Sequence, residues 1–264
     1  MKRLLALVIC FMFLGAGSIF AEPLQKHIVE LGTEISYIAY DEPNVMEEKG
    51  VMYGVVGSYT YHDNWMLKAD GKFSYGQVDY KNSGTLDNIT DYMLELRGLG
   101  GYDFAVLKAT VLTPYIGFGY RYLNDDTSGK VTSTGALGYE RESNYYYSPI
   151  GIETLTELKN RWFVGITLEY DYFWKGIQKS HISDAIAGLS DLENDQNSGY
   201  RLRSSTKFRK KGEKVDIVIE PFIKYWNIEK FKEQPITYTG VIVGYGYEPK
   251  NNSTEWGVKL AMKF

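Results

Sequence analysis

One stretch of the chain carries four basic residues at positions that share one face of a β-strand. They are Arg201, Arg203, Lys207 and Arg209, and every spacing between them is even, as alternating side chains require. The stretches before and after it carry acids at even spacings too, namely Glu169, Asp171, Asp216 and Glu220. Because cross-strand partners lie only about 4.5–5.5 Å apart, three neighbouring strands would join both sets into one network of ion pairs.

Two kinds of chemistry are open to such a network. Paired charges inside a small barrel fill its interior and keep the wall rigid, since little inner space remains beyond the side chains. A row of arginines along an open passage would instead select anions. We predict the first arrangement, a nearly neutral plug of ion pairs and hydrogen bonds.

His181 and Asp184 are the pair that best suits acid–base chemistry. A histidine oriented by a carboxylate can act as a general base on water, and this pair lies in a polar segment. The same two residues also occur in ordinary solvated loops, so the pair is only a weak catalytic candidate. The chain shows no metal-ligand spacing, phosphate-binding glycine loop or nucleophile motif, so it predicts no metal and no cofactor.

The alternation that would position these groups recurs along most of the chain. The clearest example is 162–174, with one face formed by Trp162, Val164, Ile166, Leu168, Tyr170, Tyr172 and Trp174. Comparable segments lie at 29–39, 51–61, 65–75, 92–97, 112–122, 146–154, 200–208, 215–225 and 256–264. The predicted connections alternate in length, being short at 62–64, 106–110, 159–160 and 211–213 and long elsewhere. This pattern predicts an all-β fold, a closed antiparallel transmembrane β-barrel of about ten strands, with eight or twelve as alternatives.

Residues 1–21 have the layout of a secretory signal peptide, with Lys2 and Arg3 before an apolar run and a possible cleavage site after Ala21. The one cysteine, Cys10, lies in this segment, so the mature chain has no disulfide. Residues 22–264 show no dividing linker and are predicted to form one barrel domain. The net charge of −4 gives no support to nucleic-acid binding.

The last nine residues alternate to the end of the chain. Their apolar face consists of Trp256, Val258, Leu260, Met262 and Phe264. This ending resembles the closing strand of bacterial outer-membrane β-barrels, which ends in Phe and is the recognition signal for the barrel-assembly machinery. The resemblance implies a location in a Gram-negative-type outer membrane. It also implies contact with membrane lipid and lipopolysaccharide, assembly by that machinery, and a monomeric barrel.

Aromatic residues lie at both ends of the predicted strands. Trp65 and Trp162 begin their strands, whereas Tyr170, Tyr172, Trp174 and Trp256 lie toward the opposite rim. Amphipathic rings are enriched at the two membrane interfaces. A secreted β-sandwich would explain the alternation equally well, but it predicts neither the two aromatic bands nor the terminal Phe.

The main functional prediction is a porin-like cell-envelope barrel of structural or surface-binding type, with a plugged interior and long outer loops. One alternative is a narrow channel for ions or small solutes. The other is an enzyme, because ten strands resemble the omptins, surface proteases that use an Asp pair and a His-Asp pair. His181 and Asp184 differ from the omptin motif in order and spacing, and the family's paired aspartates are absent. Barrel enzymes that modify lipid A have no better motif support.

Overall fold

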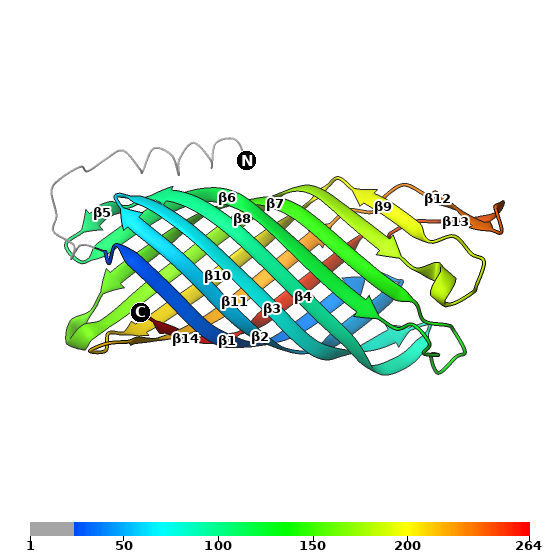
Figure 1. The fold of residues 1–264 in the computed structure, drawn as a ribbon, viewed down its shortest axis with the longest axis horizontal. Coiled ribbons are helices and arrows are strands. Elements are labelled where there is room, and N and C mark those ends of the chain that lie inside the picture. Colours follow the sequence, from blue (N-terminus) through cyan, green and yellow to red (C-terminus); the bar gives the residue numbers. More distant parts are fainter. Residues whose placement is uncertain (1–23) are drawn as a thin grey trace.

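The computed structural model describes residues 24–264, and in it ten antiparallel strands close into a barrel (Figure 1). The predicted signal peptide, residues 1–21, lies outside the described residues. The wall consists of β1 (His27–Glu42), β2 (Met46–Asp63), β3 (Trp65–Asn82), β4 (Gly84–Tyr102), β6 (Thr110–Asp126), β7 (Glu140–Glu157), β8 (Trp162–Ser180), β10 (Gly199–Lys210), β11 (Asp216–Ile228) and β14 (Asn251–Lys263). The prediction of an all-β, ten-stranded antiparallel barrel is confirmed.

The barrel closes where the first strand meets the last. β1 pairs with β14 from Glu30↔Lys263 to Asp41↔Asn252, so no strand of the wall has a free edge. The backbone amide of Phe264 donates to the carbonyl of Val29 at 2.8 Å, and the start and end of the described chain therefore share one end of the barrel. We call this the terminal end and the opposite one the loop end.

Four short strands lie outside this ten-stranded path. β5 (Phe104–Leu107) pairs with β6 near the terminal end, and β9 (Leu192–Gln196) pairs with β8 near the loop end. β12 (Gln234–Tyr238) and β13 (Val241–Gly246) form a separate hairpin beyond the wall at the loop end (Figure 1). Two 3-10 turns, η1 (Lys159–Arg161) and η2 (Ile182–Asp184), complete the described elements. Neither of them could cross a membrane as a helix.

The connections at the loop end are partly shorter than the sequence indicated. Residues 43–45 join β1 to β2, and Ser83 alone joins β3 to β4, so the long connections predicted there are wrong. The polar residues on both sides of these two turns are still paired as strand. The hairpins are therefore longer than the roughly 9–11 residues that cross a membrane. Long connections do follow β6, β8 and β11, at 127–139, 181–198 and 229–250.

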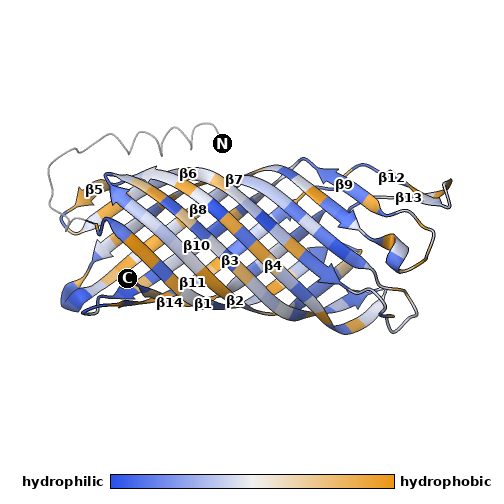
Figure 2. Ribbon diagram, in the orientation of Figure 1, coloured by the Kyte–Doolittle hydropathy of each residue, from blue (hydrophilic) through white to orange (hydrophobic). Residues whose placement is uncertain are grey.

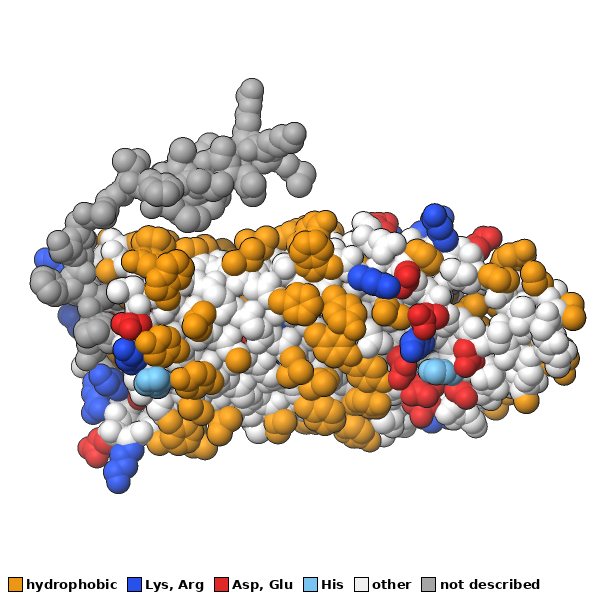
Figure 3. Space-filling view, turned by 45° about the horizontal axis from the view of Figure 1, so that its top comes forward, with side chains coloured by type: hydrophobic (Ala, Val, Ile, Leu, Met, Phe, Trp, Pro, Cys, Tyr) orange, Lys and Arg blue, Asp and Glu red, His pale blue; other side chains and the backbone are white. Residues whose placement is uncertain are grey.

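The wall is apolar outside and polar inside, as the pleat of a strand dictates. Along each strand, hydrophobic and hydrophilic residues alternate (Figure 2). Hydrophobic side chains gather over the middle of the outer surface, and charged ones gather toward both ends (Figure 3). The predicted interface aromatics all face outward, with exposed fractions from 41% to 65%; they are Trp65, Trp162, Tyr170, Tyr172, Trp174 and Trp256.

Candidate functional site

The centre of the lumen is occupied by Arg201, whose side chain is only 1% exposed. Its guanidinium contacts the carboxylates of Asp171 and Glu95 and lies 3.1 Å from Glu169. It also lies over the rings of Tyr147 and Trp226, at 4.7 and 4.9 Å from their centroids. A buried charge is tolerated only when it is paired and hydrogen-bonded, and Arg201 meets that condition from several strands at once.

Glu169 extends this network across the barrel. It accepts a hydrogen bond from Tyr115 at 2.7 Å and pairs with Arg97 at 3.0 Å. Arg97 in turn donates two hydrogen bonds to Asp70, at 2.8 and 3.0 Å. Side chains from β3, β4, β6, β8 and β10 therefore meet at one level, and they bridge the lumen from wall to wall.

A second group of ion pairs lies nearer the terminal end. Glu220 contacts Lys259 at 2.6 Å and lies 3.7 Å from Arg203 and 4.0 Å from Lys207. Asp216 lies 3.7 Å from Arg209. The structure thus brings the predicted lumen residues together as charged pairs inside the barrel; these residues are Glu169, Asp171, Arg201, Arg203, Lys207, Arg209, Asp216 and Glu220.

The interior is not purely ionic, in contrast to the plug that the sequence suggested. Two buried apolar clusters face the lumen on the loop side, one formed by Tyr145, Tyr147, Phe173, Trp226 and Ile228 and the other by Ile38, Met52, Val78, Ile89 and Met93. Two further lumen residues are Trp226, which lies against Arg201, and Glu255, which contacts Lys72 and lies 3.3 Å from Lys224. Alternation from Tyr225 and from Trp256 already pointed these two side chains inward. Sequence reasoning missed both because it sought charged residues on the inner face and began the last strand at Trp256.

An acidic layer lies beyond these clusters, on the loop side of the outer aromatic residues. Arg141 pairs there with Glu42 at 2.6 Å and with Glu248 at 3.3 Å. Burial raises the pKa of Glu248 to about 7, although the charge of Arg141 opposes the shift. Burial and the nearby charge of Asp125 raise the pKa of Glu48 well above its usual range. Within residues 24–264, no group of three His, Cys, Asp or Glu side chains is arranged to hold a metal ion.

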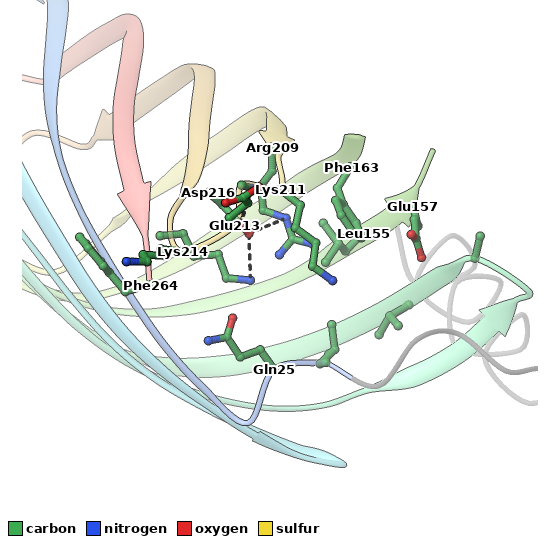
Figure 4. A pocket seen from close by; sticks show the side chains of 15 residues that line it. Gln25, Leu155, Glu157, Phe163, Arg209, Lys211, Glu213, Lys214, Asp216 and Phe264 are labelled. Carbon is green, nitrogen blue, oxygen red and sulfur yellow. Dashed lines mark hydrogen bonds and ion pairs between the residues drawn. The ribbon is translucent and has the colours of Figure 1, made fainter. Parts of the chain in front are cut away.

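The terminal end of the lumen is open. A cavity of about 380 Å³ enters there, and side chains of Leu155, Phe163, Asp216 and Phe264 are among those around it (Figure 4). Two smaller cavities of about 70 and 80 Å³ lie deeper in the lumen. Near the loop end, the lumen cavity beside Glu48 and Arg141 is only about 20 Å³. Of these four lumen cavities, the three on the terminal side therefore hold most of the space.

The chain is similar to the outer-membrane protease OmpT from Escherichia coli, with a TM-score of 0.62 over 92% of this chain and 99% of that chain. The fold is that of the bacterial outer-membrane β-barrels. The identity to OmpT is 9%, so this similarity extends to the architecture and not to a site.

Other outer-membrane barrels resemble the chain more weakly. The translocator domain of the autotransporter NalP from Neisseria meningitidis gives a TM-score of 0.44 at 10% identity, over 98% of this chain and 93% of that one. Neisserial surface protein A gives 0.37 at 9% identity, over 91% and 98%. No family model and no curated protein sequence matches the chain.

In this outer-membrane-type barrel the two catalytic candidates do not meet through their side chains. The imidazole of His181 lies 3.5 Å from Asp191 and 3.7 Å from Glu142, at its two ring nitrogens. Asp184 accepts a hydrogen bond from the backbone amide of Glu140 at 3.2 Å instead. Asp184 therefore supports the chain at the start of β7, and the carboxylates beside His181 come from β7 and from the connection after β8.

Proposed function

We propose that this chain is an outer-membrane β-barrel of structural or surface-binding type, whose closed lumen supports the loop end as a rigid scaffold outside the cell. The observation that carries this proposal is the enclosure of Arg201 by three carboxylates and two aromatic rings at mid-lumen. The apolar outer surface and the aromatic rims support the membrane location. The proposed partners are outer-membrane lipid, lipopolysaccharide and the barrel-assembly machinery.

The order of the layers along the barrel axis supports a closed lumen. The Arg201 network spans the barrel, and the two apolar clusters follow it toward the loop end. Conduction needs a continuous polar passage, whereas the cavity beside Arg141 has a volume of only about 20 Å³. The side chains that close the lumen are held by packing and by paired charges, which favours a permanent plug.

The β12–β13 hairpin supports a role in surface binding. Residues 234–247 contain no charged residue, and β13 exposes large apolar side chains, including Val241 at 67% and Tyr245 at 64%. Among the described residues β13 pairs with β12 alone. Apolar side chains gather at this tip of the molecule (Figure 3), and exposed apolar patches of this kind mark interaction sites.

Conductance of the purified barrel tests the closed lumen. The protein is refolded in detergent, its folding is verified by a heat-modifiability gel, and the same sample is inserted into planar bilayers. We expect no steady conductance from the wild type. The double variant Arg201→Ala, Trp226→Ala should conduct, because it removes a buried cation and the ring against which it lies.

The variant Lys175→Ala is the matched control, because Lys175 lies on the outer face and pairs with Asp195 in solvent. It should behave as the wild type does. Steady wild-type conductance that is abolished by neutralising Arg201 and Arg203 would instead establish an anion channel. Replacement of 234–247 by a short turn tests the surface role, since it should remove any adhesion or ligand phenotype while the barrel still refolds.

A further inference from the structure

The open space on the terminal side forms one blind chamber, which the scaffold function does not use. The entrance cavity of about 380 Å³ and the next one, of about 70 Å³, share lining residues that include Val111 and Lys263. The second and the deepest, of about 80 Å³, share Lys68 and Lys207. The deepest also borders Arg97, which belongs to the layer that closes the lumen. The chamber is therefore accessible from the terminal end alone.

The middle of this chamber has an excess of positive charge. Four bases line it against two acids, the bases being Lys68, Lys207, Arg209 and Lys263 and the acids Glu30 and Glu153. The four basic side chains come from β3, β10 and β14 and converge on one small space. Asp216 and Glu220 lie 3.7–4.0 Å from three of these bases and offset part of this charge. An anion between the four bases would still be attracted from several sides.

The three lysines among these four bases form long ion pairs. Lys68 lies 3.8 Å from Glu153, Lys207 lies 3.5 Å from Glu30, and Lys263 lies 4.0 Å from Asp216. Charge-assisted hydrogen bonds normally measure about 2.7–2.9 Å, and each ammonium group has three N–H donors. These three lysines consequently keep donors for a further acceptor.

Lys259 provides the contrast within the same lumen. It lies 2.5 Å from Glu30 and 2.6 Å from Glu220, so two carboxylates already hold its ammonium group at hydrogen-bond distance. Lys259 borders the deepest cavity but not the middle one, so the long ion pairs belong to the lysines of the middle cavity and not to every lumenal lysine.

The remaining walls of the chamber are mixed, with hydroxyl groups such as those of Thr60 and Thr113 beside apolar side chains. Ile28, Met66, Val111 and Leu155 line the middle cavity opposite the bases, and Phe163 lines the entrance. Ligand sites typically combine an apolar lining with a few convergent polar groups in roughly 300–1,000 Å³. The entrance cavity, which Val111, Leu155 and Lys263 line, falls within this range, and Lys68 and Lys207 line the smaller cavity behind it.

We propose that the chamber binds a small organic anion, whose carboxylate or phosphate head group is held by Lys68, Lys207 and Lys263 and whose short apolar part lies against Val111 and Leu155. The ligand enters from the terminal end, which faces the periplasm in the orientation proposed above. The single entrance rests on the closed lumen proposed above, but binding and conductance are measured separately, so the failure of one proposal is distinguishable from the failure of the other.

Binding by the full refolded barrel in a neutral detergent tests the proposal, with benzoate and benzylammonium as probes of equal size and opposite charge. Titration calorimetry should show binding of benzoate and little or none of benzylammonium. Inorganic phosphate should compete with benzoate, because it occupies the same lysines. Equal binding of the two aromatic probes would overturn the proposal, as would phosphate that fails to compete.

Two single variants assign the head-group site. Lys68→Gln and Lys263→Gln should each weaken benzoate binding by about tenfold, since each removes a charged donor. Lys175→Gln on the outer face is the matched control and should bind as the wild type does. A heat-modifiability gel verifies that every variant is folded, and Lys68→Arg should restore most of the affinity. Unchanged binding in folded Lys68→Gln and Lys263→Gln would exclude these lysines as the site.

Discussion

Arg201 on β10 and Asp171 on β8 are paired in register, and their side chains lie in direct contact with only 1% of each exposed. The alternation of the two strands places both residues on the inner face, and the cross-strand pairing places them opposite each other. Because Glu95 also contacts Arg201 from β4, this local pair belongs to a layer that crosses the whole lumen.

Removal of one member of this pair should destabilise the barrel strongly. Arg201→Met leaves buried carboxylates without their main cation, and breaking such a pair costs about 3–5 kcal/mol. The double variant Arg201→Met, Asp171→Asn should lose less than the sum of the single variants, because the residues are coupled. Urea unfolding in detergent measures the free energy of unfolding of these variants.

The control is Lys175→Met, which removes a solvated pair and should cost less than about 1 kcal/mol. An equally small loss for Arg201→Met would contradict the central role of the layer.

Two glycines should respond oppositely to substitution by alanine. A Cβ atom at Gly119 would collide with the ring of Tyr147, whereas a Cβ atom at Gly98 would meet nothing within 4 Å. Gly119→Ala should therefore destabilise the barrel by about 1–3 kcal/mol through overpacking. Gly98→Ala should be neutral or stabilise it by up to about 1 kcal/mol, because alanine restricts the unfolded chain. Equal unfolding midpoints for the two variants would refute the packing of Tyr147 over Gly119.

The acidic layer at the loop end should make stability depend on pH. Burial raises the pKa of Glu248 from 4.5 to about 7, so its stabilising contribution is complete below about pH 4.5 and is lost as the pH rises through 7. Glu248→Gln imitates the protonated side chain and removes this dependence. The free energy of unfolding of the variant relative to wild type should therefore rise by about 3 kcal/mol between pH 4.5 and pH 8. A difference that stays constant over this range would show that Glu248 ionises normally.

The terminal residue should affect assembly more than stability. Phe264 faces outward, and its backbone amide still bonds to Val29 after substitution, so Phe264→Ala should refold in detergent with a nearly unchanged unfolding midpoint. In cells the same variant should yield less heat-modifiable protein in the outer membrane if Phe264 belongs to the predicted assembly signal. Phe104→Ala, at an exposed aromatic of the same end, is the control. Normal assembly of Phe264→Ala would argue against a signal at this position.

Much of this architecture could be predicted from residue order alone. The alternation from Val29 onward assigned most side chains of the wall to a face, which determined the ten strands, the aromatic rims and the inward direction of Arg201 and Glu169. It failed for Lys175, which lies on the outer face because the pairing of β7 with β8 shifts register beside it. These features depend on the pleat of a strand, which is local and repeats every two residues. Connection lengths were harder to predict, because the polar residues around Ser83 remain paired as strand and show no break in composition.

Only the tertiary structure decided which inward side chains share a level. Arg201 meets Glu95 although the two are far apart in sequence, and Tyr147 and Trp226 join them from two further strands. The tilt and stagger of strands around a closed barrel set these meetings, and alternation along one strand contains no information about them. For the same reason the sequence determined an inner face rich in charge. The layer around Arg201, the apolar clusters and the chamber at the terminal end depended on the register and tilt of the strands in the closed barrel.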